Sequence, residues 1–491
     1  MHISDIRNYM RCQRLYQLSL QDEYRPFPYF NISIDVDESL RKKLDINRYY
    51  EGVANDNNEN TLRAFEGYQW LLKCRFVYRG LRVRVPVLYH DGNECILYFN
   101  YLSTAPSDGE LTNIKWTCAV MENLGFVIKN IFLIHLNPSY VRHGNIDHKK
   151  LWHISNCFYN DNNNPTRNVL DAYRKSRFNL DAQLDELLHF DMDETMDVIR
   201  TNKCTGRSKC RYYDICFPEE SDLPDNSILN LVSSQHKYEM FGNGIKYLSD
   251  IDLEYFEGTQ QQYAQIMADK RGGTFYEEIA LENWLQTNRS ETMSFFDFEW
   301  DLYPFPPYDD MSVMQVLCFQ YSLHVQRDGK IEHYQFIGEG DCRRAFIEQL
   351  IREVPQEGVI FAYNARGAEI MRLRELQETF PEYHDQLENI IVRVVDLAQP
   401  FIKGIVYDVR MKGLYSLKVI QAMLDQQHTY KDLEVGNGLE AVAIHRQIEK
   451  ETDPEKKKEY YQQLYEYCGL DSYAMVEVYQ WLNSLIKPEQ G

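Results

Sequence analysis

The stretch SFFDFEW at residues 294–300 places two carboxylates, Asp297 and Glu299, inside a run of four aromatic side chains. Side chains two residues apart on a β-strand point to the same face. The two acids therefore project together, while Phe296 and Phe298 point to the opposite face. Two ionised carboxylates this close repel each other unless a cation lies between them. Mg²⁺ and Mn²⁺ prefer oxygen ligands, so the pattern favours a strand within a divalent-metal site. A solvated strand end is the structural alternative.

A second pair of candidate residues lies on a helix expected over residues 456–482, where Tyr467 precedes Asp471 by four positions. Residues four apart on a helix share one face. Asp471 would complete the metal site, and the Tyr467 hydroxyl would orient a water that the metal makes acidic enough to cleave a phosphodiester. Two ions about 4 Å apart would also stabilise the leaving oxygen. The alternatives are an aromatic packed in a Tyr-rich helix and a solvated acid.

These two motifs, D-x-E on a strand and Y-x-x-x-D on a late helix, resemble the tyrosine variant of the DnaQ-like (DEDD) exonuclease superfamily. The wider series FFDFE, FQYSLH, FAYNARGAEIMRL, RVVDL, YSLKVI and YCGLDSYAMV is similar to one bacterial family, whose members fuse such a domain to an N-terminal RecB-like domain. The resemblance covers most of residues 291–485 and, more weakly, the N-terminal part. It implies an RNase H-like α/β fold and two Mg²⁺ or Mn²⁺ ions that serve to remove nucleotides from 3′ ends.

The middle motif departs from the superfamily pattern, which places an Asp shortly after an Asn. AYNARGAEIM offers Asn364 and then Glu369, one residue further along and Glu in place of Asp. Asp396 in RVVDLA is the rival fourth ligand, or a supporting residue. His445 would suit the histidine variant only with an Asp five residues later, which is missing, so Tyr467 is preferred. The metal ligands that the resemblance implies are Asp297, Glu299, Glu369 and Asp471.

The N-terminal part contains a cysteine pattern, CTGRSKCRYYDIC, in which Cys204, Cys210 and Cys216 are equally spaced; Cys12 lies near the start of the chain. Thiolates gathered on one centre favour an iron–sulfur cluster or zinc, and the spacing does not separate the two. One early and three late cysteines resemble the iron–sulfur RecB-like nucleases. That resemblance implies a 4Fe–4S cluster that joins the two ends of the domain. Zinc and buried free thiols are the alternatives.

RecB-like nucleases need an Asp on one strand and an E-x-K on the next, with acids that hold Mg²⁺. GLRVRVPVLY and ECILYFNYL are expected as these strands around the turn HDGN, and they lack the acids and the Lys at the required places. The nuclease site of this domain is therefore expected to be lost, and the domain to bind or guide nucleic acid. Arg207, Lys209 and Arg211, with Tyr212 and Tyr213, suit phosphate contact and base stacking. An ordinary solvated loop fits the same residues.

Length and composition give the domain organisation, because 491 residues exceed one ordinary core. We expect a RecB-like domain at 1–225, a helical connector at 226–290 and a DnaQ-like exonuclease domain at 291–491. The net charge of −21 argues against a general polyanion-coating protein, but not against a local nucleic-acid groove. The chain shows no signal peptide and no membrane-length apolar segment, so a cytoplasmic protein is expected.

The leading prediction is a metal-dependent 3′–5′ exonuclease that acts on single-stranded 3′ ends of DNA or RNA. One alternative is a non-catalytic nucleic-acid-binding or scaffold protein, which the altered middle motif and the acidic composition favour. Another is an interaction module held together by zinc. The sequence names no protein partner and no oligomeric state.

Overall fold

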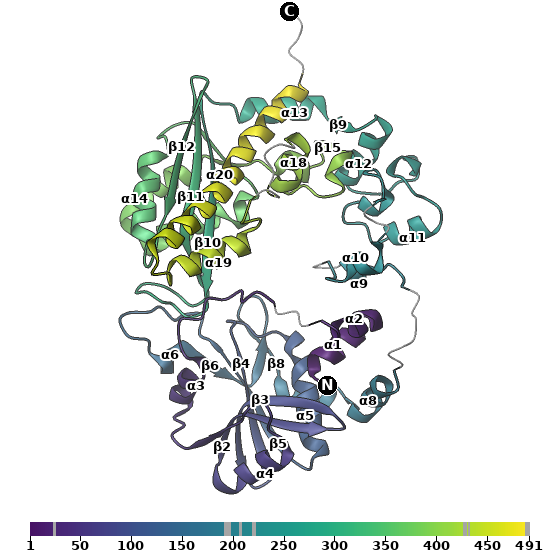
Figure 1. Cartoon of the computed structure of the whole chain (residues 1–491), viewed down its shortest axis with the longest axis vertical. Helices are drawn as coiled ribbons and strands as arrows, with labels where there is room; N and C mark the ends of the chain where they lie inside the picture. Colours follow the sequence, from purple (N-terminus) through teal and green to yellow (C-terminus); the bar gives the residue numbers. More distant parts are fainter. Residues whose placement is uncertain are drawn as a thin grey trace, which may run out of the picture. The chain divides into compact units, whose positions relative to one another are not determined.

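The computed structural model of the chain describes residues 1–22, 26–190, 198–205, 209–218, 222–425, 430 and 433–486. Contacts divide the chain into two compact units (Figure 1). The first unit comprises Met1–Ile199, Lys203–Cys216 and Leu302–Gln315, and the second comprises Arg200–Asn202, Phe217–Asp301 and Val316–Gly491. Sheets and helices occur throughout, so the chain is mixed α/β. Among the described residues, no helix has the length and apolarity needed to cross a membrane.

The first unit is built on a six-stranded sheet in the order β1-β2-β3-β4-β5-β6. The strands pair antiparallel except for β1 with β2 and β4 with β5, which are parallel. Alternation fixes the buried face: Leu81, Val83 and Val85 of β3 are buried, whereas Arg84 between them is exposed. The bounds are β1 Tyr49–Glu51, β2 Trp70–Tyr78, β3 Leu81–Asp91, β4 Glu94–Tyr101, β5 Val127–Leu136 and β6 Trp152–Ser155.

Helices cover this sheet, and α5 (Leu111–Asn123) packs against β2, β3 and β5. Its buried residues, Trp116 and Cys118 among them, join the core of the first unit. A small hairpin, β7 (Cys157–Tyr159) with β8 (Pro165–Asn168), lies beyond the sheet. The other helices along residues 3–216 are α1 Ile3–Arg11, α2 Gln13–Ser19, α3 Val36–Leu44, α4 Asn58–Gly67, α6 His148–Leu151, α7 Val169–Lys175, α8 Leu180–Leu188, α9 Asn202–Thr205 and α10 Tyr213–Cys216.

The segment 302–315 also packs into the first unit, although it lies within the expected exonuclease domain. Phe305 and Val313 are buried in a cluster with Trp152 of β6. The Arg142 N–H donates to the carbonyl of Met311 over 2.9 Å. Residues 226–290, expected as a separate connector, pack as part of the second unit. The two compact units therefore differ from the three expected segments. Side chains such as Phe305 are assigned to a unit by their tertiary contacts, which the sequence does not show.

The second unit is built on a five-stranded sheet in the order β12-β11-β10-β13-β14. The central strand β10 contains the stretch SFFDFEW, and it pairs in parallel with β13, which pairs in parallel with β14. On the other side of β10, β11 and β12 form an antiparallel pair. The bounds are β10 Thr292–Tyr303, β11 Gln315–Arg327, β12 Lys330–Ile337, β13 Val359–Ala362 and β14 Val394–Asp396.

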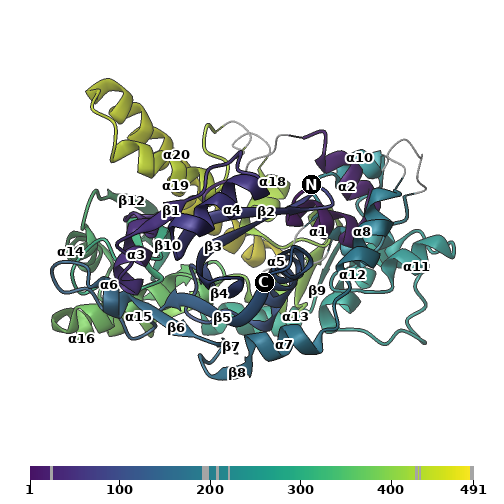
Figure 2. The ribbon, with the colours of Figure 1, turned by 90° about the horizontal axis from the view of Figure 1, so that it is seen from below.

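The two faces of this sheet pack against different helices, as Figure 2 shows for α14 to α16 and for α19 and α20. Phe295 packs toward α20, and Phe296 and Phe298 pack toward α14 and α15. By alternation, Asp297 and Glu299 share the α20 face. The helices are α11 Lys237–Gly242, α12 Gln260–Lys270, α13 Glu278–Thr287, α14 Arg343–Glu353, α15 Glu369–Thr379, α16 His384–Ile391, α17 Gln399–Ile402, α18 Leu417–Leu424, α19 Gly438–Ile448 and α20 Pro454–Leu485; a short antiparallel pair joins β9 (Thr274–Tyr276) to β15 (Val406–Asp408).

The long helix α20 begins where the sequence provides a start signal. Asp453 is the N-cap, and its side chain accepts the N–H of Glu455. Pro454 occupies the first helical position, where its missing N–H costs nothing. The middle of α20 is buried from Leu464 onward, which carries Tyr467 and Asp471 into the interior of the second unit.

Candidate metal centre and its surroundings

Three of the predicted acids meet between β10 and α20. One carboxylate oxygen of each of Asp297, Glu299 and Asp471 lies within 4.8 Å of the others. Glu299 and Asp471 are buried, and Asp297 is half-buried. The first turn of α19 lies beside them, since a Cβ placed on Gly438 would stand 3.4 Å from Glu299 Oε2. The alternation of β10 and the packing of α20 thus bring together acids that are about 170 residues apart in sequence.

Glu369, the fourth predicted acid, is the first residue of α15 and is only 2 % exposed. It is not one of the three acids whose oxygens lie within 4.8 Å. Its charge nevertheless raises the pKa of Asp297, and its Oε2 has no hydrogen-bond partner among the described residues. The loop before it turns at Asn364, which has a φ of 57° and so occupies the left-handed region that Asn tolerates. This turn and the short helix Ala365–Gly367 accommodate the extra residue of the motif.

The acids raise one another's pKa values in the absence of a cation. Burial and, second, the charge of Asp471 raise the pKa of Glu299 to about 8. Burial also raises the pKa of Glu369 to about 8 and that of Asp297 well above its usual range. An all-oxygen donor set with uncompensated charge fits Mg²⁺ or Mn²⁺, and a bound cation would reverse these shifts.

Tyr467 lies one helical turn before Asp471 and is 3 % exposed. Burial raises the pKa of Tyr467, and the charges of Asp471 and Glu299 raise it as well. The Tyr467 hydroxyl therefore lies near the acid cluster. Asp471 lies on the same face of α20, four residues further along. A second tyrosine, Tyr430, donates its hydroxyl to Asp471 Oδ1 over 2.5 Å.

Lys418 of α18 lies beside the acids, and the sequence did not single it out. Its Nζ donates to the Tyr467 hydroxyl over 3.0 Å and to the carbonyl of Gly436 over 2.7 Å. Its charge lowers the pKa of both Glu299 and Asp471. The sequence shows this lysine next to apolar residues in YSLKVI, but that pattern does not indicate which side chains it contacts.

His445, the residue of the rejected histidine variant, lies in a different environment. Its ring stacks on Phe319 with centroids 3.8 Å apart, and its Nε2 donates to the carbonyl of Gly338 over 2.8 Å. The acids whose charges act on it are Glu449, Asp301 and Glu339, none of which belongs to the cluster. His445 therefore serves core packing in this structure.

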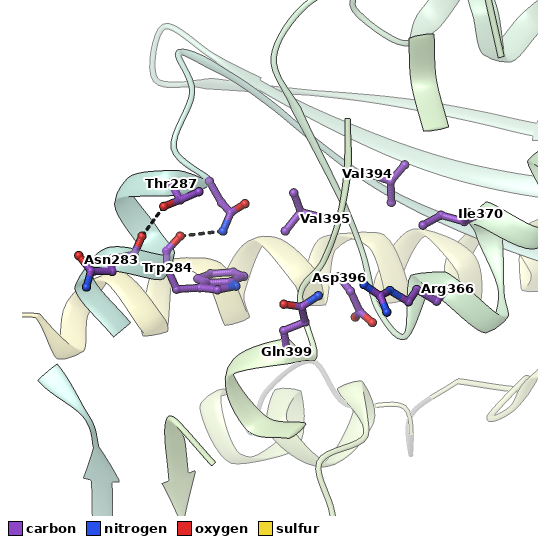
Figure 3. A pocket seen from close by; sticks show the side chains of 10 residues that line it. Asn283, Trp284, Thr287, Arg366, Ile370, Val394, Val395, Asp396 and Gln399 are labelled. Atoms are coloured by element: carbon purple, nitrogen blue, oxygen red, sulfur yellow. Dashed lines mark hydrogen bonds between the residues drawn. The ribbon is translucent and has the colours of Figure 1, made fainter. Parts of the chain in front are cut away.

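Asp396 stands at the end of β14 and holds a loop. Its Oδ1 accepts the N–H groups of Asn364 and Ala398 over 2.9 and 3.0 Å. Its charge raises the pKa of Glu369, so the two carboxylates are neighbours. Asp396 also lines a pocket of about 440 Å³ that lies between α13, β14 and the start of α15, where Trp284, Arg366 and Gln399 are further wall residues (Figure 3).

The four predicted cysteines gather in the first unit. Cys12 lies at the junction of α1 and α2, and the N–H of Cys210 donates to the carbonyl of Cys204 over 2.7 Å. Burial raises the pKa of Cys216, and the charges of Cys210, Cys12 and Cys204 raise it further. The four thiols are therefore neighbours in the fold.

The basic residues of the cysteine loop are engaged by acids. Lys209 pairs with Asp214 over 2.7 Å, and Arg211 lies 3.8 Å from Asp22. Tyr212 and Tyr213 are 6 % and 3 % exposed, so neither ring is available for stacking on a base, contrary to expectation. Arg207 lies outside the described residues.

The strands β3 and β4 carry acids only at the turn that joins them. Asp91 and Glu94 are both exposed there, and Glu94 pairs with Lys129 over 2.7 Å. The remaining positions of the two strands offer no carboxylate. The loss of a nuclease site in the first unit stays a prediction.

Comparison with known proteins gives two similarities. Residues 294–416 match a family model described as a domain of unknown function (DUF2779). No curated protein matches the chain. Among solved structures, the chain is similar to a family B DNA polymerase from the hyperthermophilic archaeon Pyrobaculum calidifontis, with 16% identity and a TM-score of 0.27. That similarity covers 40% of this chain and 25% of the polymerase, so the chain matches about a quarter of the polymerase's length.

Proposed function

We propose that the second unit is a metal-dependent 3′–5′ exonuclease with a DnaQ-like, RNase H-like fold. The observation that carries the proposal is the meeting of Asp297, Glu299 and Asp471 within 4.8 Å. The unpartnered Oε2 of Glu369 supports it, because a buried carboxylate oxygen without a partner is costly unless something binds there. A central strand that carries the first two acids and a late helix that carries the third agree with the resemblance seen in the sequence.

The chemistry follows from the residues at the centre. Asp297, Glu299, Glu369 and Asp471 would hold Mg²⁺ or Mn²⁺ ions, which when bound polarise the phosphodiester and acidify an attacking water. The Tyr467 hydroxyl would hold that water in line with the phosphorus. Burial of these groups excludes bulk water and strengthens each electrostatic contact.

The substrate of the proposed reaction is a single-stranded 3′ end of DNA or RNA. The acid cluster makes no distinction between the two sugars.

The test is degradation of 5′-labelled single-stranded DNA and RNA with Mn²⁺, comparing wild type with Asp297→Ala and Asp471→Asn. A ladder of shortened products is expected from wild type only, and a 3′-phosphorylated substrate should resist. Asp385→Asn, at a fully exposed acid of the same unit, is the matched control and should keep full activity.

Thermal unfolding in EDTA shows whether the inactive variants are folded; Asp471→Asn should unfold no lower than wild type, because it removes a repelling charge. Activity that survives in both active-site variants would overturn the assignment. No cleavage by wild type would instead favour a nucleic-acid-binding or scaffold protein.

We also propose that Cys12, Cys204, Cys210 and Cys216 bind a 4Fe–4S cluster in the first unit. The mutual proximity of the four thiols supports this. Anaerobic purification should give a brown protein with about four iron and four sulfide per chain and absorption near roughly 400 nm. One zinc per chain without iron would overturn the cluster and support the zinc-held module.

A further inference from the structure

Lys418 is surrounded by the polar groups that line one side of the acid cluster. Besides its bonds to Tyr467 and Gly436, its Nζ lies 4.6 Å from the ring centroid of Tyr467 and 4.8 Å from that of Tyr430. Tyr430 in turn donates its hydroxyl to Asp471 Oδ1. An ammonium, two phenol rings and a metal-site carboxylate thus form one connected network.

The hydrogen bond from Lys418 fixes what the Tyr467 hydroxyl can do. A phenol oxygen that accepts a bond from an ammonium has its own proton directed elsewhere, and it acts there as a donor. During cleavage, the same hydroxyl is positioned to hold a reacting oxygen.

The ammonium also supplies a positive charge beside the cluster of Asp297, Glu299 and Asp471. Lys418 is half-buried and forms no ion pair at contact distance among the described residues, so its charge acts on the cluster without occupying a ligand oxygen. A lysine that only stabilised the fold could obtain a similar small stabilisation from an ion pair with an exposed carboxylate. Its placement over two phenol rings beside Asp471 instead links its charge to the site.

We propose that Lys418 is a positioning residue of the metal centre, which orients the Tyr467 hydroxyl and offsets one carboxylate charge of the cluster. This rests on the proposed nuclease function. It adds a residue that acts through Tyr467, and it predicts that loss of Lys418 has opposite effects on catalysis and on metal affinity.

A double-mutant cycle tests the first half. Lys418→Met keeps the apolar stem and removes the ammonium, and it should lower kcat by about 10- to 100-fold with KM within about threefold, because only orientation is lost. In a Tyr467→Phe background the same change should alter kcat by less than about threefold, because the hydroxyl that it orients is gone. Lys403→Met, at an exposed lysine after α17, is the matched control and should leave kcat unchanged.

Metal affinity tests the second half without any turnover. Calorimetric titration with Mn²⁺ should show Lys418→Met binding about two- to fivefold more tightly than wild type, because a like charge has been removed. A lysine that only supported the fold would give weaker binding and a lower unfolding temperature in EDTA.

The outcomes separate this inference from the nuclease proposal. Cleavage by wild type with an unchanged kcat in Lys418→Met, or an equal loss of kcat in both backgrounds, overturns the positioning role. Absence of cleavage by wild type defeats the nuclease proposal, and the Mn²⁺ titration then decides on Lys418 alone. Unchanged or weaker Mn²⁺ binding would overturn its role as a counter-charge.

Discussion

At the scale of single residues, the main feature of the candidate metal centre is a group of buried carboxyl groups that lie close together. Glu299 and Glu369 are buried with pKa values raised to about 8, mainly by burial. The free energy of unfolding therefore depends on whether protons or cations neutralise them. We therefore expect metal binding at this site to raise the free energy of unfolding, and thermal unfolding can measure this effect.

For the metal-free protein we expect stability to fall as pH rises. The folded state retains protons on Glu299 and Glu369 up to about pH 8, whereas the unfolded chain releases them near pH 4.5. Their contribution is thus full below pH 4.5 and is lost as pH rises toward 8. Thermal unfolding in EDTA at pH 5.5, 7.0 and 8.5 measures this, and Mn²⁺ should raise the unfolding temperature most at pH 8.5. Glu369→Gln should flatten the slope; an unchanged slope would mean that Glu369 does not titrate in this range.

Asp396 can be separated from a metal ligand by two substitutions. Its Oδ1 accepts two backbone N–H groups, a role that an Asn side-chain oxygen also fills. Asp396→Asn should therefore keep most activity, while Asp396→Ala should destabilise the protein by about 1–3 kcal/mol through unsatisfied N–H groups. Denaturant unfolding and the nuclease assay measure both effects. Equal inactivity of the two variants would identify Asp396 as a ligand.

At the scale of elements, a pocket lies between helix α13 and the edge strand β14. It combines an aromatic ring, Trp284, with a guanidinium, Arg366, and with the amide of Gln399 (Figure 3). Arg366 is exposed and forms no ion pair within the described part of the chain. Because Asp396 joins this pocket to the neighbourhood of Glu369, we expect a nucleotide of the substrate to lie here.

Reversal of the charge in this pocket should weaken substrate binding more than catalysis. Arg366→Glu is expected to raise KM for single-stranded DNA by about 3- to 10-fold at low salt, and the effect should shrink as salt rises. Arg352→Glu, at an exposed position of α14, is the control of equal charge change. A similar rise in KM for both variants would point to a general electrostatic effect rather than to the pocket.

The sequence predicted those elements whose pattern is local. SFFDFEW becomes the central strand β10, GLRVRVPVLY and ECILYFNYL become paired strands β3 and β4, and the helix of Tyr467 and Asp471 is α20. Alternation and helical spacing indicate which face of its element each acid occupies, because both are properties of one element. The position of Glu369 depended on a loop conformation at Asn364, and its role in metal binding stays a prediction.

Residues whose role depends on tertiary contacts escaped the sequence. The contact of Lys418 with Tyr467 depends on the packing of α18 against α20, which the sequence does not show. The burial of Tyr212 and Tyr213 was equally invisible, since a loop rich in Arg and Tyr has the same composition whether its rings are buried or exposed.

At the scale of the whole molecule, the segment 302–315 makes the two halves of the sequence interdependent. It follows the acid-bearing strand β10, yet its side chains belong to the core of the first unit. Phe305 is fully buried there, in an edge contact with Trp152 at 5.4 Å between ring centroids. A boundary placed at residue 291 would remove this contact.

Truncation of Phe305 should therefore destabilise the first unit, although the residue lies far along the chain. We expect Phe305→Ala to cost about 3–5 kcal/mol. Hydrogen exchange should show lost protection in β6 and in residues 137–141, while α14 to α16 keep theirs. Loss of protection confined to α14 to α16 would contradict this assignment. A fragment of residues 1–225 should likewise be less soluble than the full chain.

The position of this segment in the sequence also determines when the core of the first unit can be completed during synthesis. Domains near the N-terminus usually fold while the rest of the chain is still being made. Here the first unit has nearly all its residues by Cys216, but its core lacks Phe305 and Val313 until the ribosome has added the stretch up to Gln315. At usual elongation rates, that interval is on the order of 5–20 s. During that time the surface around Trp152 remains uncovered, and a nascent chain in this state is the form in which we expect chaperones to find it.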